Sequence, residues 1–274
     1  MLSGAAPERL DFLKCIWNKC NPVCSLEENN RNVTTNIYAK LNSINFDQKT
    51  LDAIWLLGFN GWNIYELFFQ AIQTARMHGL SLDGALHPLI SDLKFKDCKY
   101  QSQIAHLALE TGDAMDKWPQ EIPRIPHNGK SFDSPKQKFA YELVLFSTAF
   151  VFLHELRHVM FNIDGNRPST SIKEENECDK FAKAFLLDTV EQYALLKKED
   201  VYAVFAKRSM GIALGSILLF GLTPKESRYL SSDHPSISNR IKSLMSFSKS
   251  QEPFISYEPN YWAFASSLLI WMSL

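Results

Sequence analysis

The sequence predicts a mainly α-helical protein, an α+β fold in which helices dominate and the β element is minor. Apolar residues recur at helical spacing in several segments, and in residues 65–76 they share one face. Residues 143–153 and 209–223 contain no charged residue, a pattern typical of helices that are buried on all sides. The region near residues 115–130 contains several prolines, so we expect it to hold the minor β element as a short edge strand.

Composition and charge narrow the classes of function. The chain has 274 residues, of which 46% are hydrophobic and 22% are charged, which is ordinary for a globular protein of one or two domains. The formal net charge is -1, and lysine and arginine are scattered along the chain. We therefore expect no nucleic-acid partner, because binding of that kind requires a concentrated basic surface.

The first residues and the cysteines indicate the compartment. Residues 1–8 lack the basic start and the apolar run of a secretory signal peptide. The number of cysteines, five, is odd, and we interpret them as reduced thiols of a cytoplasmic protein. Cys15, Cys20 and Cys24 could form a second metal site, although their spacing fits no common zinc template.

Two charge-free stretches raise the question of a membrane. Residues 209–223 and 261–274 both fall short of the roughly 18–20 apolar residues that span a bilayer. We therefore expect buried segments, with an interfacial or re-entrant segment as the alternative. In particular, residues 251–274 are expected to form an apolar C-terminal segment packed on the body of the protein.

A central helix is expected to carry the chemistry, with its start marked by Asp133-Ser134-Pro135 and its end by Asp164-Gly165. His154 and His158 stand four residues apart near its end, so both side chains lie on one face and can bind the same metal ion. Glu155 stands beside them and is the candidate that takes a proton from a metal-activated water. Because so short a motif also arises by chance, its interpretation depends on the residues that follow.

The next helix offers a third ligand. Ser171 and Glu174 have the spacing of a capping box, which would use the Glu174 carboxylate at the helix start. A carboxylate on an inward face is costly unless a metal, a charge or hydrogen bonds satisfy it. We therefore predict Glu175 as the third metal ligand and Asp179 as the residue that fixes a ligand histidine. The alternative is that Glu175 is only a first-turn acidic residue favoured by the helix dipole. The helical period that defines this inward face runs through Glu175, Cys178, Asp179, Ala182, Phe185 and Leu186.

Two further helices complete the expected core. Residues 211–222 are expected to form a buried helix behind the site. Another helix opens within residues 231–236, with Ser232 or Asp233 as its cap, and Arg240 lies along it. Its apolar face is expected to hold Ile237, Ile241, Leu244 and Met245.

Three motifs stand in sequence order: H-E-x-x-H at residues 154–158, E-x-x-x-D at residues 175–179, and H-P-x-x-x-x-R at residues 234–240. This order resembles the gluzincin metallopeptidases, in particular the HtpX-like and CAAX-prenyl-endopeptidase group. Those relatives are integral membrane proteins, and a soluble chain of this length is more similar to the Lit-type phage-exclusion peptidases. The resemblance covers about residues 135–245 and does not extend to the first 120 residues.

The resemblance implies a zincin-like catalytic core at residues 126–250, and it implies Zn2+ as the cofactor. The pattern of apolar residues leads us to expect a mostly helical region at residues 1–125 before this core. Within the core, His234 is the candidate catalytic residue that stabilises the oxyanion. The residues that the resemblance places at the site are the zinc ligands His154, His158 and Glu175, the catalytic base Glu155, the supporting Asp179, and His234 and Arg240, which would line it.

The expected activity is zinc-dependent hydrolysis of peptide bonds in a protein substrate. The resemblance to Lit-type peptidases adds an activating partner and a role in phage defence. Two alternatives stay open. One is a zinc-bound regulatory or sensor module without general proteolysis, and the other is a metal-free helical structural protein.

Overall fold

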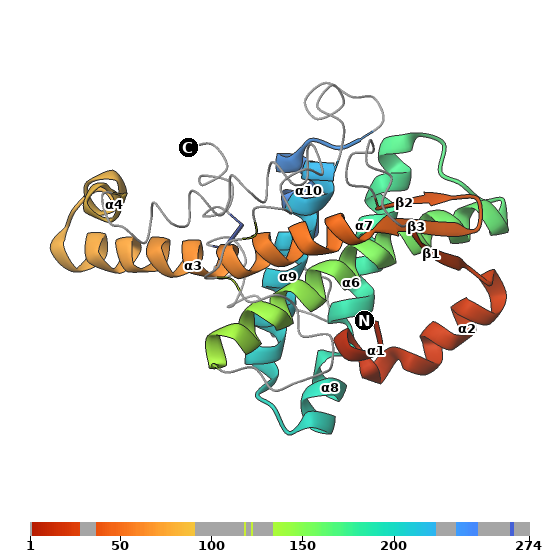
Figure 1. Ribbon diagram of the computed structural model, residues 1–274, viewed down its shortest axis with the longest axis horizontal. Coiled ribbons are helices and arrows are strands. Elements are labelled where there is room, and N and C mark those ends of the chain that lie inside the picture. Colours follow the sequence, from red (N-terminus) through yellow and green to blue (C-terminus); the bar gives the residue numbers. More distant parts are fainter. Residues whose placement is uncertain are drawn as a thin grey trace.

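The computed structural model describes residues 2–27, 37–90, 118, 122, 134–222, 234–245 and 264–265. Helices dominate this part of the chain and a small sheet accompanies them (Figure 1), so the predicted fold class is confirmed. The helices are α1 (Leu2–Ala5), the 3-10 helix η1 (Pro7–Arg9), α2 (Leu10–Cys20), α3 (Gln48–His78), α4 (Leu82–Ile90), α6 (Pro135–Asp164), α7 (Ser171–Leu187), α8 (Val190–Lys197), α9 (Val201–Leu222) and α10 (Ile237–Met245).

Helix α6 is the centre of the molecule, and α3, α7 and α9 all pack against it (Figure 1). Ser134 is the N-cap of this helix, and its side chain accepts a hydrogen bond of 3.2 Å from the backbone N–H of Gln137. Pro135 occupies the first turn. Gly165 follows its end in the left-handed conformation, with φ of 63°, where a residue without Cβ is not strained. The predicted start and end of this helix are therefore confirmed.

The parts of the charge-free stretches that the structure describes are mostly buried. Two helices, Gln137–Asp164 of α6 and Val201–Phe220 of α9, are long and apolar enough to cross a membrane, and 78% of the apolar window of each is buried. Helix α9 is longer than the charge-free stretch that we judged too short for a span, because it begins at Val201. Such burial is typical of core helices and is compatible with a soluble protein. Of the C-terminal segment, the structure describes Phe264 and Ala265, and both are fully buried.

Small residues let α9 approach α6 closely. Gly215 lies so near α6 that a Cβ atom would stand 2.8 Å from Phe150 Cδ1 and 3.1 Å from the backbone oxygen of Ser147. Gly211 faces Phe146 at least as tightly. The helix behind the site is therefore packed against α6 with little room for movement.

Helix α3 starts beside the sheet, crosses α6 and carries α4 at its far end (Figure 1). Leu67, Phe68 and Ala71 of its predicted apolar face are buried, whereas Ile72 is 39% exposed. The helix ends at His78, and Gly79 follows with φ of 64°.

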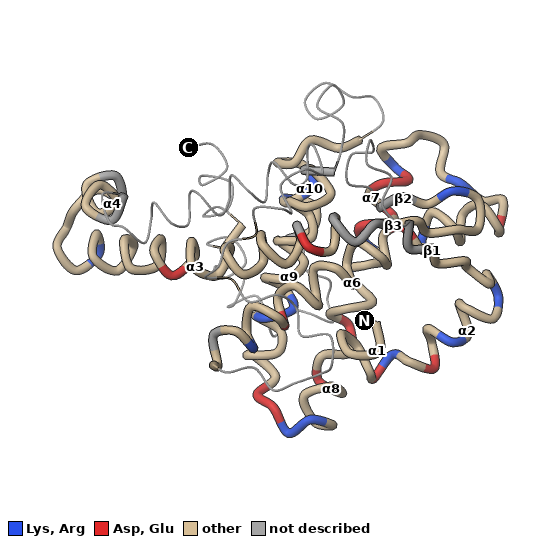
Figure 2. Tube along the Cα trace, in the orientation of Figure 1, with Lys and Arg blue, Asp and Glu red and all other residues tan. Residues whose placement is uncertain are grey.

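Figure 2 shows both acidic and basic residues on α2, α3 and α8.

A three-stranded sheet packs beside the half of α6 that carries the histidines (Figure 1). It consists of β1 (Val23–Glu27), β2 (Ile37–Lys40) and β3 (Ser43–Asp47) in the order β1-β3-β2, with β1 parallel and β2 antiparallel to β3. Phe46 of β3 meets Phe152 of α6 edge to face, with ring centroids 5.0 Å apart. This aromatic contact fixes the sheet next to the start of the histidine motif.

The position of the β element differs from the expectation. The strand expected near residues 115–130 falls outside the described residues except for Trp118 and Ile122, neither of which is in a strand. The observed sheet lies within the region that we expected to be mostly helical. Its strands have four or five residues, too few for a clear alternation, and the parallel pairing of β1 with β3 joins segments that no local pattern connects.

A buried ion pair fastens the N-terminal segment to the core. Arg208 of α9 is fully buried, and its Nη1 donates hydrogen bonds of 2.7 Å to Glu8 Oε1 and to the backbone oxygen of Leu186. Its Nη2 donates a second bond, of 3.2 Å, to Glu8 Oε2. The ring of Tyr193 lies 4.5 Å from the same guanidinium. A charge buried this deeply is stable only with such a set of partners.

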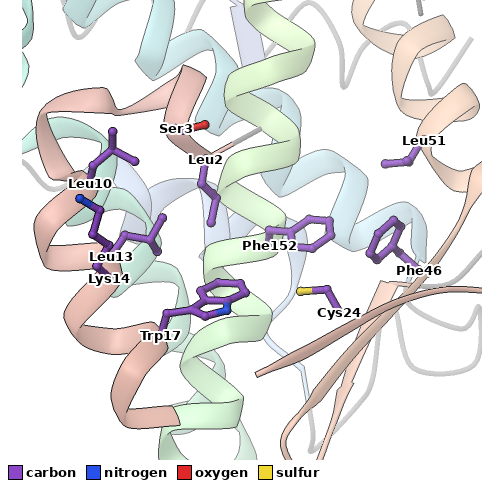
Figure 3. A pocket seen from close by; sticks show the side chains of 10 residues that line it. All are labelled: Leu2, Ser3, Leu10, Leu13, Lys14, Trp17, Cys24, Phe46, Leu51 and Phe152. Atoms are coloured by element: carbon purple, nitrogen blue, oxygen red, sulfur yellow. The ribbon is translucent and has the colours of Figure 1, made fainter. Parts of the chain in front are cut away.

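An apolar cavity of about 490 Å³ lies between the N-terminal helices, the sheet and α6 (Figure 3). Side chains of Leu13 and Trp17 on α2 form one wall, and Phe46 and Phe152 form another. The residues that line the cavity do not include the histidines or the acidic residues of the site predicted above. The cavity is therefore separate from that site.

Candidate metal centre

The two histidines of the α6 motif lie on the face that α7 covers. Their imidazole rings are neighbours, with centroids 5.0 Å apart, and the Nε2 atoms of His154 and His158 are 3.2 Å apart. The side chain of His154 is 2% exposed and that of His158 is 16% exposed. The spacing of four residues on one helix thus brings two nitrogen donors together in a buried position.

Glu175 of α7 supplies the third donor at the same place. Its Oε2 lies 3.4 Å from His154 Nε2, and its Oε1 lies 3.3 Å from His158 Nε2. A tetrahedral zinc ion with bonds of about 2.0–2.1 Å holds its ligand atoms about 3.3 Å apart. Each Nε2 atom therefore has one Glu175 oxygen, a different oxygen for each histidine, at about the separation of two zinc ligands, and imidazole and carboxylate are donor types that suit that metal.

Each histidine is also held from behind by a carboxylate of α7. Asp179 Oδ1 lies 2.9 Å from His154 Nδ1, and Glu174 Oε1 lies 2.7 Å from His158 Nδ1. Because a carboxylate only accepts hydrogen bonds, both Nδ1 atoms act as donors, and both Nε2 atoms face Glu175. The contact expected of Asp179 is present, while that of Glu174 was not foreseen.

The start of α7 explains why Glu174 was missed. The N-cap is Thr170, whose side chain accepts a hydrogen bond of 3.3 Å from the backbone N–H of Lys173. The predicted capping box between Ser171 and Glu174 is therefore wrong, because the helix begins one residue earlier and Lys173 occupies the position that the glutamate would need. The carboxylate of Glu174 is left available to His158.

Helix α10 brings a buried arginine to the same cluster. Arg240 is 4% exposed, and its Nη2 donates a hydrogen bond of 2.7 Å to Glu175 Oε2. Its Nε forms an ion pair of 3.0 Å with Asp179 Oδ2, without hydrogen-bond geometry. Arg240 thus links the predicted third ligand to the carboxylate that holds His154.

His234 stands at the more open side of the cluster. Its Nδ1 lies 3.5 Å from Glu175 Oε2, and its side chain is 36% exposed. Helix α10 begins at Ile237, later than expected, and Ser236 Oγ accepts a hydrogen bond of 3.3 Å from the backbone N–H of Asn239. The caps predicted at residues 232 and 233 lie outside the described residues.

Glu155 faces the sheet. Its Oε2 accepts a hydrogen bond of 2.8 Å from the backbone N–H of Ala39 in β2, and the residue is 7% exposed. Burial raises the pKa of this carboxyl, although His154 and His158 act to lower it. The sheet therefore sets the position of the candidate base, a contact that the sequence did not reveal.

Acidic groups outnumber basic ones in this cluster. Glu155, Glu174, Glu175 and Asp179 surround the histidines, and Arg240 is the buried cation that contacts them in the described structure. A buried excess of carboxylates is costly unless positive charge balances it. A divalent cation between the Nε2 atoms would supply that charge.

In the absence of a metal, the histidines themselves take up positive charge. Burial acts to lower the pKa of His154, but the carboxylates of Glu175 and Asp179 outweigh it and raise this pKa to about 10. Burial also acts to lower the pKa of His158, and hydrogen bonding to Glu175 raises it above its ordinary value. The histidines in turn lower the pKa of Glu175 against the effect of its burial. Metal binding would replace the imidazolium protons.

Cys178 is a second candidate for the third ligand. It is fully buried on the inward face of α7, and its Sγ lies within 4.8 Å of a ring nitrogen of His154 and of His158. Burial, with help from the neighbouring carboxylates, raises the pKa of its thiol, so it is protonated unless a metal binds it. The sequence placed Cys178 on this face without giving it a role.

Comparison with known proteins identifies the family. The model of the Peptidase U49 family matches residues 44–258, which include all of the residues described above at the metal centre except Ala39. No curated protein and no solved structure matches the chain. Because the family model spans most of the chain, this protein belongs to the Peptidase U49 family, and its function is proteolytic, the hydrolysis of peptide bonds in a protein substrate.

Proposed function

We propose that the protein is a zinc-dependent endopeptidase whose zinc ligands are His154, His158 and Glu175. The observation that carries the proposal is the mutual spacing of 3.2–3.4 Å between the three donor groups. Two histidines and a glutamate are a known ligand set of catalytic zinc, and they leave the fourth position for water. The motif order that resembles gluzincins supports the same assignment.

The catalytic role falls to Glu155. Bound zinc would polarise the scissile carbonyl and lower the pKa of the attacking water. Glu155 takes the proton from that water and delivers it to the leaving amine. Burial supports this role, because it raises the pKa of the carboxyl and so favours holding the proton between the two steps. The N–H of Ala39 donates a hydrogen bond to the carboxylate and so holds it in place.

His234 and Arg240 complete the site in different ways. His234 is partly exposed beside Glu175, a position from which an imidazole can donate a hydrogen bond to the oxyanion that forms on the substrate. Arg240 is buried and acts through Glu175 and Asp179, whose carboxylates it keeps in place. The proposal thus makes His234 a catalytic residue and Arg240 a positioning residue.

The resemblance to Lit-type peptidases supports a narrower proposal, in which proteolysis depends on an activating partner and serves phage defence. A peptidase of this kind would leave a general substrate such as casein intact. The test is to compare new protein N-termini in cell lysate with and without phage infection, using the wild type and Glu155→Gln. Cleavage products that require both infection and Glu155 would support the trigger, and products that appear equally without infection would contradict it.

The first experiment is the metal content of the purified protein by mass spectrometry. We expect about one zinc per chain in the wild type and its loss in His154→Ala and Glu175→Ala. Cys178→Ser is the matched variant on the same face of α7 and should keep its zinc. Loss of zinc from Cys178→Ser with retention in Glu175→Ala would assign the third ligand to Cys178. A well-folded wild type without zinc, even after supplementation, would contradict the proposal.

A second experiment separates metal binding from catalysis. Glu155→Gln should keep zinc and the melting temperature of the wild type, because the amide still accepts the hydrogen bond from Ala39. Proteolysis, measured as the rate at which new protein N-termini form in lysate with and without phage infection, should fall by about 10²–10⁴-fold, the usual contribution of a general base. Glu177→Gln, on the exposed face of α7, is the control and should cleave at the rate of the wild type. Unchanged proteolysis in Glu155→Gln would contradict the assignment of Glu155 as the catalytic base.

A further inference from the structure

We propose that Glu174 is a positioning residue of the metal centre, which holds His158 in the tautomer and orientation that leave its Nε2 free for zinc. This inference rests on the zinc site proposed above. It starts from one contact: Glu174 Oε1 of α7 lies 2.7 Å from Nδ1 of His158 on α6. Since the carboxylate can only accept, the proton of a neutral His158 is fixed on Nδ1, and the lone pair is left on Nε2.

The contact has a counterpart on the other histidine. Asp179 Oδ1 lies 2.9 Å from His154 Nδ1, so each imidazole has its own carboxylate, and both carboxylates come from α7. With both Nδ1 atoms engaged in this way, the two Nε2 atoms face each other at 3.2 Å. Partners of this kind fix the ring and its tautomer, and their loss weakens metal binding about 10–100-fold. Helix α7 thus supplies one proposed ligand, Glu175, and orients the other two.

A purely structural role for Glu174 accounts less well for its surroundings. Glu174 also forms an ion pair with Arg167, whose Nε lies 3.7 Å from Oε1 and whose side chain is 54% exposed, a geometry that contributes little energy. Favourable interaction with the helix dipole needs no burial, yet the Glu174 side chain is only 13% exposed. Glu177, which pairs with Lys180 on the same helix, is 47% exposed. The burial of Glu174 is explained by the hydrogen bond to His158.

The test compares Glu174→Ala, Glu174→Gln and the control Glu177→Ala in the full-length chain. Zinc affinity is measured by competition with a chromophoric chelator. The hydrogen bond is measured by NMR of the zinc-loaded protein, as the slowly exchanging Nδ1–H resonance of His158. We expect Glu174→Ala to bind zinc about 10–100-fold more weakly and to lose that resonance. Glu174→Gln keeps an acceptor oxygen, so it should retain the resonance and most of the affinity, and Glu177→Ala should change neither.

Several outcomes would overturn the inference. Glu174→Ala that binds zinc as tightly as the wild type would show that His158 needs no partner at this position. Equal losses in Glu174→Ala and Glu177→Ala would show a general effect of charge on α7. Both results require a wild type that binds zinc, so they refute the role of Glu174 alone. A wild type that takes up no zinc would instead refute the proposed function, and the inference with it.

Discussion

Adjacent carboxylates on α7 make different contacts because successive residues of a helix point about 100° apart. Glu175 reaches the Nε2 atoms of both histidines, whereas Glu174 reaches only the Nδ1 of His158. Asp179 comes four residues after Glu175, so it lies on the same face of α7 as Glu175 and contacts His154. The chemistry of the site is therefore decided by single-residue differences in position along one helix.

The metal-free protein should lose stability as the pH rises. The pKa of His154 is raised from 6.5 to about 10 in the folded protein. A histidine with a raised folded pKa stabilises the fold fully below pH 6.5, and this contribution disappears as the pH rises through about 10. We expect the melting temperature in excess chelator to fall across this window. Thermal unfolding at stepped pH checks this, with His154→Gln as the control that should show a smaller fall; equal falls in both would contradict the expectation.

Removal of the buried guanidinium should destabilise the protein. Arg240→Met would leave Glu175 and Asp179 without the cation that contacts both of them. Breaking a buried ion pair by removing one partner costs about 3–5 kcal/mol. Urea unfolding of the chelated protein measures the loss, and Lys242→Met, at an exposed position on the same helix, should have almost no effect. A change in Arg240→Met no larger than that in Lys242→Met would show that Arg240 is not needed to balance the carboxylates.

At the level of elements, the close contact of α6 with α9 depends on residues without side chains. Gly215→Ala would place a Cβ 2.8 Å from Phe150 Cδ1 and 3.1 Å from a backbone oxygen of α6 that cannot move away. Overpacking of this kind costs about 1–3 kcal/mol, which exceeds the gain in helix propensity from alanine. Chemical denaturation should show a lower free energy of unfolding. Gly4→Ala, whose Cβ would meet Leu145 at an ordinary 3.6 Å, is the control and should be neutral.

The elements differed in how well the sequence revealed them. Helix α6 was predicted with its start and end because its signals are local: a capping serine before a proline, a charge-free run and a glycine. Helix α7 was predicted one residue late at its N-terminus, since Thr170 and Ser171 are both good caps and only the fold selects between them. The sheet was missed because β1 pairs directly and in parallel with β3, although β2 lies between them in the sequence.

For the whole molecule, the ion pair between Glu8 and Arg208 joins the N-terminal segment to the core. The side chains are 4% and 0% exposed, so Glu8→Gln would leave a buried guanidinium without its counter-ion. The expected loss is about 3–5 kcal/mol in the free energy of unfolding. Urea unfolding measures it, beside Glu191→Gln at an exposed position of α8. Equal stability of the two variants would indicate that the N-terminal segment is held by apolar packing alone.

The family match shows that this molecule is a peptidase. Residues from four helices and strands form its candidate site. His154, Glu155 and His158 come from α6, the carboxylates from α7, and Arg240 from α10, while Ala39 of β2 fixes the base. The match confirms the expected peptidase and its protein substrate. Zinc, the gluzincin assignment, the site roles, the domain boundaries and the link to phage defence stay predictions.

The sequence by itself determined the helical fold class and the central helix, and its helical period placed His154 with His158 on one face and Glu175 with Asp179 on another; Arg240 of α10 was placed at the site by the family resemblance. The sequence could do so because helical period and cap chemistry depend only on nearby residues. The tertiary structure decided which carboxylate meets which nitrogen, that Glu174 contacts His158, and that a strand near the N-terminus holds Glu155. Those choices depend on how α7 and the sheet dock on α6, and docking is set by contacts between residues far apart in the chain, which no local pattern records.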